Sequence, residues 1–295
     1  MSQPAYRGRF APTPSGPLHF GSLVAALGSY LDARARGGEW LVRMEDVDPP
    51  RVVPGAADAI LHSLEAYGFE WSHPVLVQSR RGEAYHAALD RLLQAGRVYG
   101  CTCSRKTLAE TARMGVDGPI YPGACRGHPP RTGTALRFRV PDRRIQFSDG
   151  LLGRVGCDLA AECGDFVLRR ADGVYAYHLA VVVDDADQGI THVVRGADLL
   201  TSTPRHIALQ QALGHPVPAY LHLPVALDER GEKLSKQTLA TPLDDAHPLQ
   251  GLQRAARFLG LEVGAAGTLA EFWQLAAPLW RTTTRPPIRG RRMSP

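Results

Sequence analysis

The chain carries Pro12-Thr13-Pro14-Ser15-Gly16-Pro17-Leu18-His19-Phe20-Gly21-Ser22 close to its amino terminus. The prolines and glycines of this stretch interrupt regular structure, and from residue 20 to residue 36 apolar side chains recur at helical spacing. Residues 7–11, just before the stretch, can form a short strand. We therefore predict a strand, a loop and a helix in succession. The free N–H groups and partial positive charge at the start of such a helix favour a phosphate.

The flanking sequence continues this alternation of strands and helices. A second strand is predicted at residues 40–44, and helices follow at 55–67 and 82–94. This alternation indicates an α/β fold with a parallel, doubly wound sheet. Periodicity and length predict further strands at 135–140, 166–170, 179–183 and 190–194, and helices at 203–213, 248–259 and 268–279.

Composition and charge are those of an ordinary globular protein, with 44% apolar and 21% charged residues. No apolar run approaches the ~18 residues of a membrane span, and the first ten residues lack the apolar core of a signal peptide. We expect a cytoplasmic protein that binds no membrane. Five arginines at 281–295 account for the net charge of +5, because removing them leaves 29 basic and 29 acidic residues. This basic tail is expected to be disordered, and the net charge alone does not indicate RNA binding.

A second basic motif, Lys233-Leu234-Ser235-Lys236-Gln237, lies far along the chain. Its two lysines can reach one polyphosphate as point charges. In the first stretch, His19 can donate to a developing charge, and Gly21 lets a nucleotide approach the backbone. Each motif by itself is more often a tight turn or a solvated basic loop. Their combination favours ATP binding.

Together the two motifs resemble the signatures of class I aminoacyl-tRNA synthetases, His-x-Gly-His and Lys-Met-Ser-Lys-Ser, although Ser22 and Gln237 depart from them at the last position. The resemblance spans about residues 8–241 and implies a Rossmann-like catalytic domain. Further segments resemble the glutamyl branch, namely Arg9-Phe10-Ala11-Pro12-Thr13, Arg43-Met44-Glu45-Asp46-Val47-Asp48, Tyr177-His178-Leu179-Ala180, Val182-Val183-Asp184-Asp185 and Arg195.

Two departures from ordinary glutamyl enzymes narrow the resemblance. Val181 stands where those enzymes usually carry asparagine, and about 55 residues after Thr241 replace a large helical anticodon-binding region. With the Cys-rich insertion, both departures resemble the glutamyl-Q tRNA(Asp) synthetases. The implied organisation is a catalytic domain at 1–241 with an insertion at about 100–131, a short helical part at 242–280 and the basic tail at 281–295.

This resemblance implies ATP-dependent activation of L-glutamate to glutamyl-adenylate and transfer of glutamate to the queuosine of the tRNA(Asp) anticodon. We expect the enzyme to act as a monomer, with Mg²⁺ accompanying ATP. The guanidinium groups of Arg9 and Arg195 suit the substrate's carboxylates, and Glu45 suits its ammonium group. The implied glutamate pocket comprises Arg9, Phe10, Ala11, Pro12, Thr13, Glu45, Tyr177 and Arg195. The implied ATP site comprises His19, Gly21, Ser22, Lys233 and Lys236, with His19 and Lys236 catalytic.

Three other activities stay open. The chain could be a truncated conventional glutamyl-tRNA synthetase that charges a 3′ end, a small-molecule ligase of related fold, or a non-catalytic RNA-binding relative. Pyrophosphate exchange separates the first two from the third, and the small-molecule ligase would need no RNA.

Closely spaced cysteines indicate a metal site. Cys101, Cys103 and Cys125 lie in a segment with few apolar residues, and closely spaced thiols in a reducing compartment suggest metal binding. Three thiolates supply most of a tetrahedral zinc site. Chemistry leaves the fourth ligand open, whereas the family resemblance assigns Tyr121. Such a zinc ion would be structural. The candidates from chemistry alone are His128, Asp117 and Cys157.

Two further residue pairs, one acidic and one of cysteines, allow only less specific predictions of their roles. Asp184 and Asp185 could bind magnesium, although capping or surface roles are more common for such residues. Cys157 and Cys163 are expected to be small core or surface residues.

Overall fold

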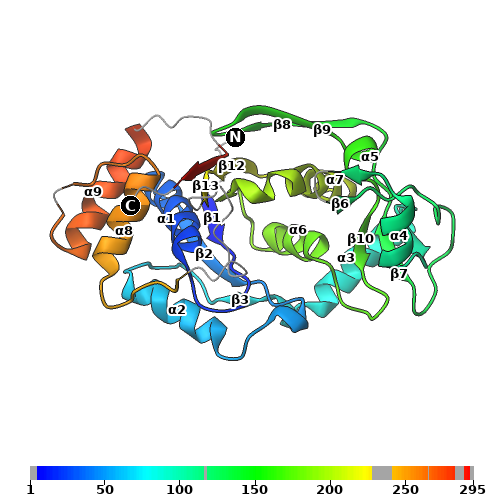
Figure 1. The fold of residues 1–295 in the computed structure, drawn as a ribbon, viewed down its shortest axis with the longest axis horizontal. Helices are drawn as coiled ribbons and strands as arrows, with labels where there is room; N and C mark the ends of the chain where they lie inside the picture. The colour runs from blue at the N-terminus through cyan, green and yellow to red at the C-terminus, as the bar shows by residue number, and fades with distance from the viewer. Residues whose placement is uncertain (1–4, 116–117, 228–240, 265, 283–288, 293–295) are drawn as a thin grey trace.

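The computed structural model describes residues 5–115, 118–227, 241–264, 266–282 and 289–292 (Figure 1). The predicted Lys233–Gln237 motif and Asp117 lie outside these residues. No helix in the described ranges is long and apolar enough to cross a membrane.

A parallel sheet forms the centre of the fold. Strands β1 (Arg7–Phe10), β2 (Glu39–Met44) and β3 (Leu76–Val77) pair in parallel, and β11 (His192–Gly196) pairs in parallel with β12 (Ala219–Leu223). The two groups meet where the Thr191 N–H donates to the Arg7 carbonyl at 2.9 Å. The strands belong to two sheets, β1-β2-β3 and β11-β12-β8-β9, with β1 next to β11. Across both sheets the order is β3-β2-β1-β11-β12, with its reversal between β1 and β11. This is the doubly wound arrangement that the sequence predicts.

Antiparallel strands extend the molecule on the β12 side. Strand β12 meets β8 (Arg144–Asp149), which forms a hairpin with β9 (Gly153–Asp158). A separate sheet has the order β10-β7-β4, made by β10 (Phe166–Arg169), β7 (Ala135–Phe138) and β4 (Val98–Cys101). The predicted strands at 135–140 and 166–170 are confirmed.

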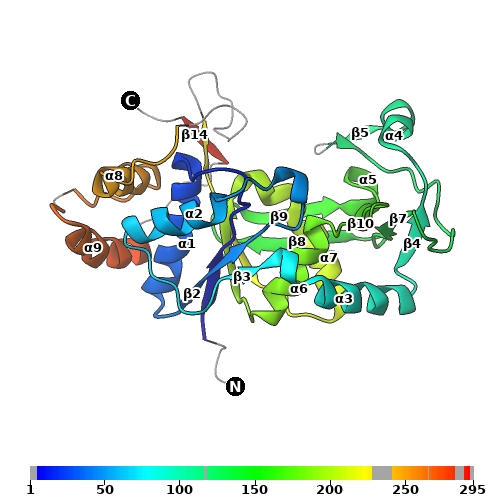
Figure 2. The same cartoon turned by 90° about the horizontal axis from the view of Figure 1, so that it is seen from below.

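Helices cover both faces of the parallel sheet. Two large buried apolar clusters result, because each helix turns an apolar face toward the strands. Helices α1, α8 and α9 lie toward one end of the molecule, and α3, α6 and α7 lie on the other side of β1 and β2 (Figures 1 and 2). Their bounds are α1 (Phe20–Ala35), α2 (Ala56–Ala66), α3 (Gly82–Gln94), α6 (Tyr177–Asp187), α7 (Thr203–Leu213), α8 (Pro248–Phe258) and α9 (Leu269–Thr282).

Two predictions of local structure are wrong. Residues 179–183 belong to helix α6, and all five are buried. A continuous apolar run carries no periodicity that separates a buried helix from a buried strand, and here the helix extends in both directions to eleven residues. Residues 290–292 form strand β14 (Gly290–Arg292), which pairs with β13 (Val225–Leu227). The prediction of a disordered tail is therefore wrong for these three residues.

The cysteine-containing segment lies at the end of the molecule opposite α8 and α9 (Figure 2). It contains helix α4 (Arg105–Thr111) and the short strands β5 (Met114–Gly115) and β6 (Gly118–Pro119), and helix α5 (Leu159–Glu162) lies near it. Its buried core is small and consists of Tyr99, Cys101, Tyr121 and Cys125.

Candidate active site and metal centre

A cavity of about 670 Å³ lies at the carboxyl ends of β1 and β11. This is the point where the strand order reverses, and open parallel sheets bind ligands at such points. Lys233 and Lys236 lie beyond the described ranges. The other predicted glutamate- and ATP-site residues all line this cavity, namely Arg9, Phe10, Ala11, Pro12, Thr13, His19, Gly21, Ser22, Glu45, Tyr177 and Arg195.

The cavity also contains residues that sequence reasoning missed. Arg51 follows β2, and its side chain, 60% exposed, pairs with Asp48 at 2.9 Å. Position directly after the carboxyl end of a parallel strand is the signal that could have identified several of these residues. The missed lining residues are Ser15, Val24, Ala25, Arg51, Val194, Gly196, Asp198, Leu199, Leu223, Pro224, Val225 and Ala226.

Arg9 is fixed by a buried carboxylate. Its Nε and Nη2 donate to the two oxygens of Asp185 at 3.1 and 3.3 Å. Asp185 also accepts a 2.7 Å hydrogen bond from Arg43, which is fully buried. Burial alone would raise the pKa of Asp185, but the charges of Arg9 and Arg43 outweigh burial and lower it.

Asp184, the neighbour of Asp185, is also buried. Its oxygens accept hydrogen bonds from Gln78 at 2.9 Å, Tyr85 at 2.7 Å and Arg81 at 3.1 Å. The capping or surface role expected for this pair is therefore wrong, because both carboxylates anchor cations and donors inside the domain. Only a fold that brings β1, β2 and α6 together reveals these partners.

Glu45 follows β2 and faces the cavity from a buried position. One of its oxygens lies 3.4 Å from Arg43 Nη2, and its N–H donates to the Pro12 carbonyl at 3.0 Å. Burial raises the pKa of Glu45, although the charges of Arg43 and Arg9 oppose this rise. A cation placed in the cavity would therefore stabilise its ionised form.

Arg195 comes from β11 and is 5% exposed. Its Nη1 lies 3.4 Å from the Tyr177 hydroxyl, and its Nη2 donates to Thr203 at 2.8 Å. Burial raises the pKa of Tyr177 to about 12, so this hydroxyl stays protonated at neutral pH. The cavity thus presents the guanidinium groups of Arg9, Arg51 and Arg195 and the carboxyl groups of Glu45 and Asp198. The two buried guanidinium groups, those of Arg9 and Arg195, match an amino acid with two carboxylates.

Val181 does not line the cavity. It packs in the apolar cluster that contains α6 and is 1% exposed. Any effect of this residue on amino-acid binding would therefore be indirect.

His19 occupies the N-cap of α1. Its Nδ1 accepts a hydrogen bond from the Gly21 N–H at 3.1 Å. A neutral imidazole that accepts at Nδ1 carries its proton on Nε2. The ring can therefore offer a donor at the start of a helix, where the dipole also favours phosphate.

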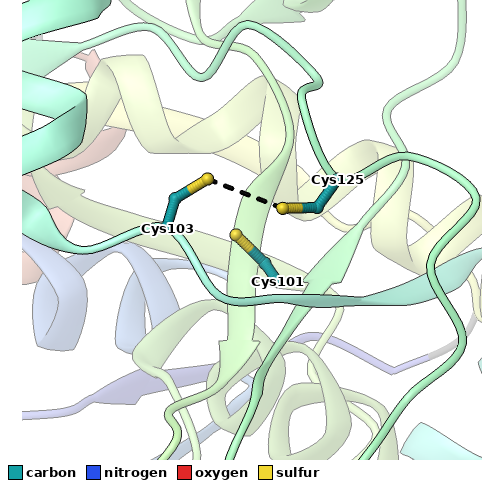
Figure 3. A group of neighbouring side chains, drawn as sticks. All are labelled: Cys101, Cys103 and Cys125. Atoms are coloured by element: carbon teal, nitrogen blue, oxygen red, sulfur yellow. Dashed lines mark hydrogen bonds between the residues drawn. The ribbon is translucent and has the colours of Figure 1, made fainter.

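The thiols of Cys101, Cys103 and Cys125 converge in the separate cysteine segment (Figure 3). Their sulfur atoms all lie within 4.8 Å of one another, and Cys103 and Cys125 are 3.5 Å apart. Burial would raise the pKa of Cys125, but hydrogen bonds from Tyr121 and the Thr102 backbone help lower it to about 6. The cluster is thus suited to a thiophilic metal ion.

Tyr121 brings an oxygen to this cluster. Its hydroxyl lies 3.4 Å from the Cys101 sulfur and 3.8 Å from the Cys103 sulfur, and it accepts the Cys125 N–H at 2.8 Å. The guanidinium of Arg137 lies over the Tyr121 ring, 4.0 Å from its centre. Both features would stabilise a phenolate bound to a metal ion, although burial and the hydrogen bonds to the neighbouring cysteines raise the pKa of Tyr121.

The other candidates for the fourth ligand are less well placed. The side chain of His128 is exposed. Cys157 belongs to a different buried cluster, and its sulfur lies 3.9 Å from that of Cys163. Cys157 thus has the core position expected for it. Asp117 is outside the described ranges.

Comparison with known proteins gives consistent results. The family model for tRNA synthetases class I (E and Q), catalytic domain, matches residues 5–256. The glutamyl-Q tRNA(Asp) synthetase of Dechloromonas aromatica (strain RCB) is 60% identical over 287 residues, which cover 95% of each chain. The protein of the same name from Chromobacterium violaceum is 55% identical over 289 residues, covering 97% of each chain.

A solved structure shares the fold. The crystal structure of glutamate-tRNA synthetase from Elizabethkingia anophelis superimposes with a TM-score of 0.79 at 26% sequence identity. The match covers 99% of this chain and 68% of that one.

Proposed function

The chain belongs to the glutamyl-Q tRNA(Asp) synthetases within the class I tRNA synthetases. We propose that it activates L-glutamate with ATP and transfers the glutamyl group to the queuosine of tRNA(Asp). The observation that supports this most strongly is the cavity itself. Arg9, Glu45, Tyr177 and Arg195 come from four separate elements and line one space with the predicted phosphate-binding loop.

In the first step, an oxygen of the glutamate α-carboxylate attacks the α-phosphorus of ATP, and pyrophosphate leaves. Arg9 and Arg195 hold the substrate's two carboxylates, while Glu45 accepts its ammonium group. This arrangement accelerates the reaction by positioning the reactants and by stabilising charge, without a protein nucleophile.

The nucleotide occupies the part of the cavity near the start of α1. His19 and the N–H group of Ser22 face the phosphates, and Gly21, whose N–H donates to His19 Nδ1, lets the nucleotide approach the backbone. Lys233 and Lys236 add positive charge as pyrophosphate departs. Mg²⁺ that accompanies ATP offsets the remaining phosphate charge.

In the second step, a hydroxyl of the RNA attacks the carbonyl carbon of glutamyl-adenylate, and AMP leaves. The proposed acceptor is a hydroxyl of the cyclopentene diol of queuosine, which resembles the ribose diol that ordinary synthetases esterify. The names of the relatives support this choice.

We also propose one structural zinc ion held by Cys101, Cys103, Tyr121 and Cys125. The donor set fits, because the three thiol sulfurs lie within 4.8 Å of one another and the Tyr121 hydroxyl lies 3.4 and 3.8 Å from two of them. With all four positions filled by protein, the ion stabilises the segment and takes no part in the chemistry. The monomeric state and the cytoplasmic location stay predictions.

ATP–pyrophosphate exchange with each amino acid, with and without RNA, tests the proposal. We expect exchange with glutamate and poor exchange with glutamine, because a neutral amide cannot replace a carboxylate between two guanidinium groups. Exchange that does not prefer glutamate would indicate a different ligase. Absence of exchange with every amino acid, even with tRNA present, would indicate a non-catalytic relative.

A further inference from the structure

Two of the cavity arginines, Arg9 and Arg195, are supported in different ways. Arg9 is paired with the carboxylate of Asp185. Arg195 makes no ion pair with any carboxylate in the described part of the chain, and its hydrogen-bond acceptors are neutral. They are the side chains of Tyr177, Thr203, His206 and His222 and the carbonyl of Leu199.

The neutrality of this environment follows from burial. His206 is 2% exposed, and burial, together with the charge of Arg195, holds its pKa well below its usual value. His222 is fully buried, and burial lowers its pKa as well. Both rings can therefore accept hydrogen bonds from a guanidinium without carrying a charge of their own.

A chain of hydrogen bonds connects Arg195 to the carboxylate of Asp149 through two intervening side chains. Asp149 lies 2.6 Å from Nδ1 of His222. Nε2 of His222 lies 3.0 Å from the Thr203 hydroxyl, which accepts a 2.8 Å bond from Arg195 Nη2. His222 is also the register partner of Arg195 in the adjacent strand, and its Nε2 lies 3.3 Å from Arg195 Nε.

The positions of the protons in this chain follow from the donors and acceptors. The ionised Asp149 can only accept, so Nδ1 of His222 carries the proton and Nε2 is an acceptor. The Thr203 hydroxyl can therefore donate to Nε2, which at 3.0 Å is closer than the Leu199 carbonyl at 3.5 Å, and it accepts from Arg195. Along this chain the donors run from Arg195 through Thr203 and His222 to Asp149, which helps to orient the guanidinium.

Asp149 is itself firmly held at the end of β8. Its carboxylate accepts the N–H groups of Leu151 and Leu152, each at 2.9 Å, and that of His222 at 3.1 Å. The anchor of the chain thus belongs to the β8–β9 hairpin, which does not line the cavity.

We propose that Thr203 and His222, anchored by Asp149, are positioning residues that orient Arg195 for a substrate carboxylate, while no carboxylate of the described residues pairs with its charge. The inference rests on the proposed function, in which Arg195 binds glutamate. A carboxylate in direct contact with Arg195 would neutralise its positive charge and weaken the preference for an anionic side chain. An imidazole and a hydroxyl orient the same group without doing so.

Thr203→Val and Thr203→Ser form a matched pair, because valine keeps the shape of threonine and serine keeps the hydroxyl. The readouts are the KM for glutamate, the KM for ATP and kcat in pyrophosphate exchange. We expect Thr203→Val to raise the KM for glutamate about tenfold while the KM for ATP stays nearly constant, since a hydrogen bond to a charged group is lost. Thr203→Ser should stay close to the parent protein. Equal values of the KM for glutamate in both variants would overturn the proposal.

His222 provides a second test if Thr203→Val fails to fold. In His222→Asn the amide nitrogen replaces Nδ1 and keeps the bond to Asp149, but no atom replaces Nε2. In His222→Gln the amide oxygen replaces Nε2 as the acceptor. We expect His222→Asn to raise the KM for glutamate more than His222→Gln does. The reverse order, or parallel changes in the KM for ATP, would indicate a merely structural role.

Thermal stabilisation by glutamate separates this inference from the proposed function. If glutamate stabilises the parent protein but the protein performs no pyrophosphate exchange, the proposed function is contradicted. If in that case glutamate stabilises Thr203→Ser but not Thr203→Val, the role of Thr203 is still supported. A parent protein that neither exchanges pyrophosphate nor gains stability with glutamate overturns both.

Discussion

The cavity and the cysteine segment are stabilised by different means. The cavity lies between two large apolar clusters, and its charged side chains are fixed by buried partners such as Asp185. The cysteine segment has a buried cluster of four residues, two of which are cysteines. Full burial of one large apolar side chain gives about 1.5–3 kcal/mol, whereas ordering each residue costs about 1–2 kcal/mol. We therefore expect the cavity to form without a ligand and the cysteine segment to depend on the proposed zinc ion.

Removing Arg195 should have the largest effect on the cavity. In Arg195→Ala a substrate carboxylate loses its buried partner, which costs roughly 2–5 kcal/mol, so kcat/KM for glutamate should fall at least about 30-fold. The zinc content should not change. Steady-state pyrophosphate exchange and metal analysis provide these values, with the exposed Arg154→Ala as the control. Glutamate activation equal to that of the parent protein would show that the pocket is assigned incorrectly.

Removing one thiol should lower the zinc content and leave glutamate activation largely intact, the opposite of the effect of Arg195→Ala. Cys103→Ser should lose the zinc ion, because a structural site rarely survives with three ligands, and residues 100–131 should become sensitive to proteases. Cys163→Ser is the matched control, because Cys163 is outside the cluster. Glutamate-dependent exchange should largely persist, since the cavity has its own support. A metal-free preparation with unchanged proteolysis would contradict the account of this segment.

A smaller effect on the metal is expected from Arg137, which stacks on the Tyr121 ring. Three thiolates and a phenolate around Zn²⁺ carry a net negative charge, and Arg137→Gln removes the nearby positive charge. Outer partners of metal ligands typically contribute 10- to 100-fold in affinity, so competition with a chelator should show zinc affinity reduced by about tenfold. Arg139→Gln, at an exposed neighbouring position, is the control. Identical zinc affinity in the two variants would exclude this role for Arg137.

The smallest effect should come from acid, which should destabilise the two regions in the same way. Asp185 beneath the cavity has a pKa below its ordinary value of 3.8 through Arg9 and Arg43, against the effect of burial. Asp165 beside the cysteine segment is likewise buried, and hydrogen bonds from Arg126 and Tyr99 lower its pKa below 3.8. A lowered folded-state pKa stabilises the protein above the unfolded value, and this stabilisation disappears as the pH falls further. Unfolding free energy should therefore decrease below about pH 3.8. Denaturant titrations at pH 3 to 7 that give a constant value would contradict this prediction.

Much of the arrangement of the cavity residues can be predicted from the sequence, because the ends of strands and the starts of helices determine where side chains meet. The motifs together with the family resemblance predict that the loop from Pro12 to Ser22 shares one site with Arg195, near the end of β11. The run at 179–183 is a helix where the pattern predicts a strand, since burial on all sides removes periodicity. The partners of Asp185 and the chain from Asp149 to Arg195 could not be predicted, because residues separated by tens of positions meet there only through the strand order.

The central claim concerns the RNA that receives glutamate. The direct measurement is transfer of labelled glutamate to three RNAs, tRNA(Asp) with queuosine, tRNA(Asp) without queuosine, and tRNA(Glu). The account predicts label on the queuosine-containing tRNA(Asp) and none above background on the other two. Label on tRNA(Glu), or equal label on tRNA(Asp) with and without queuosine, would contradict the account and indicate a conventional glutamyl enzyme.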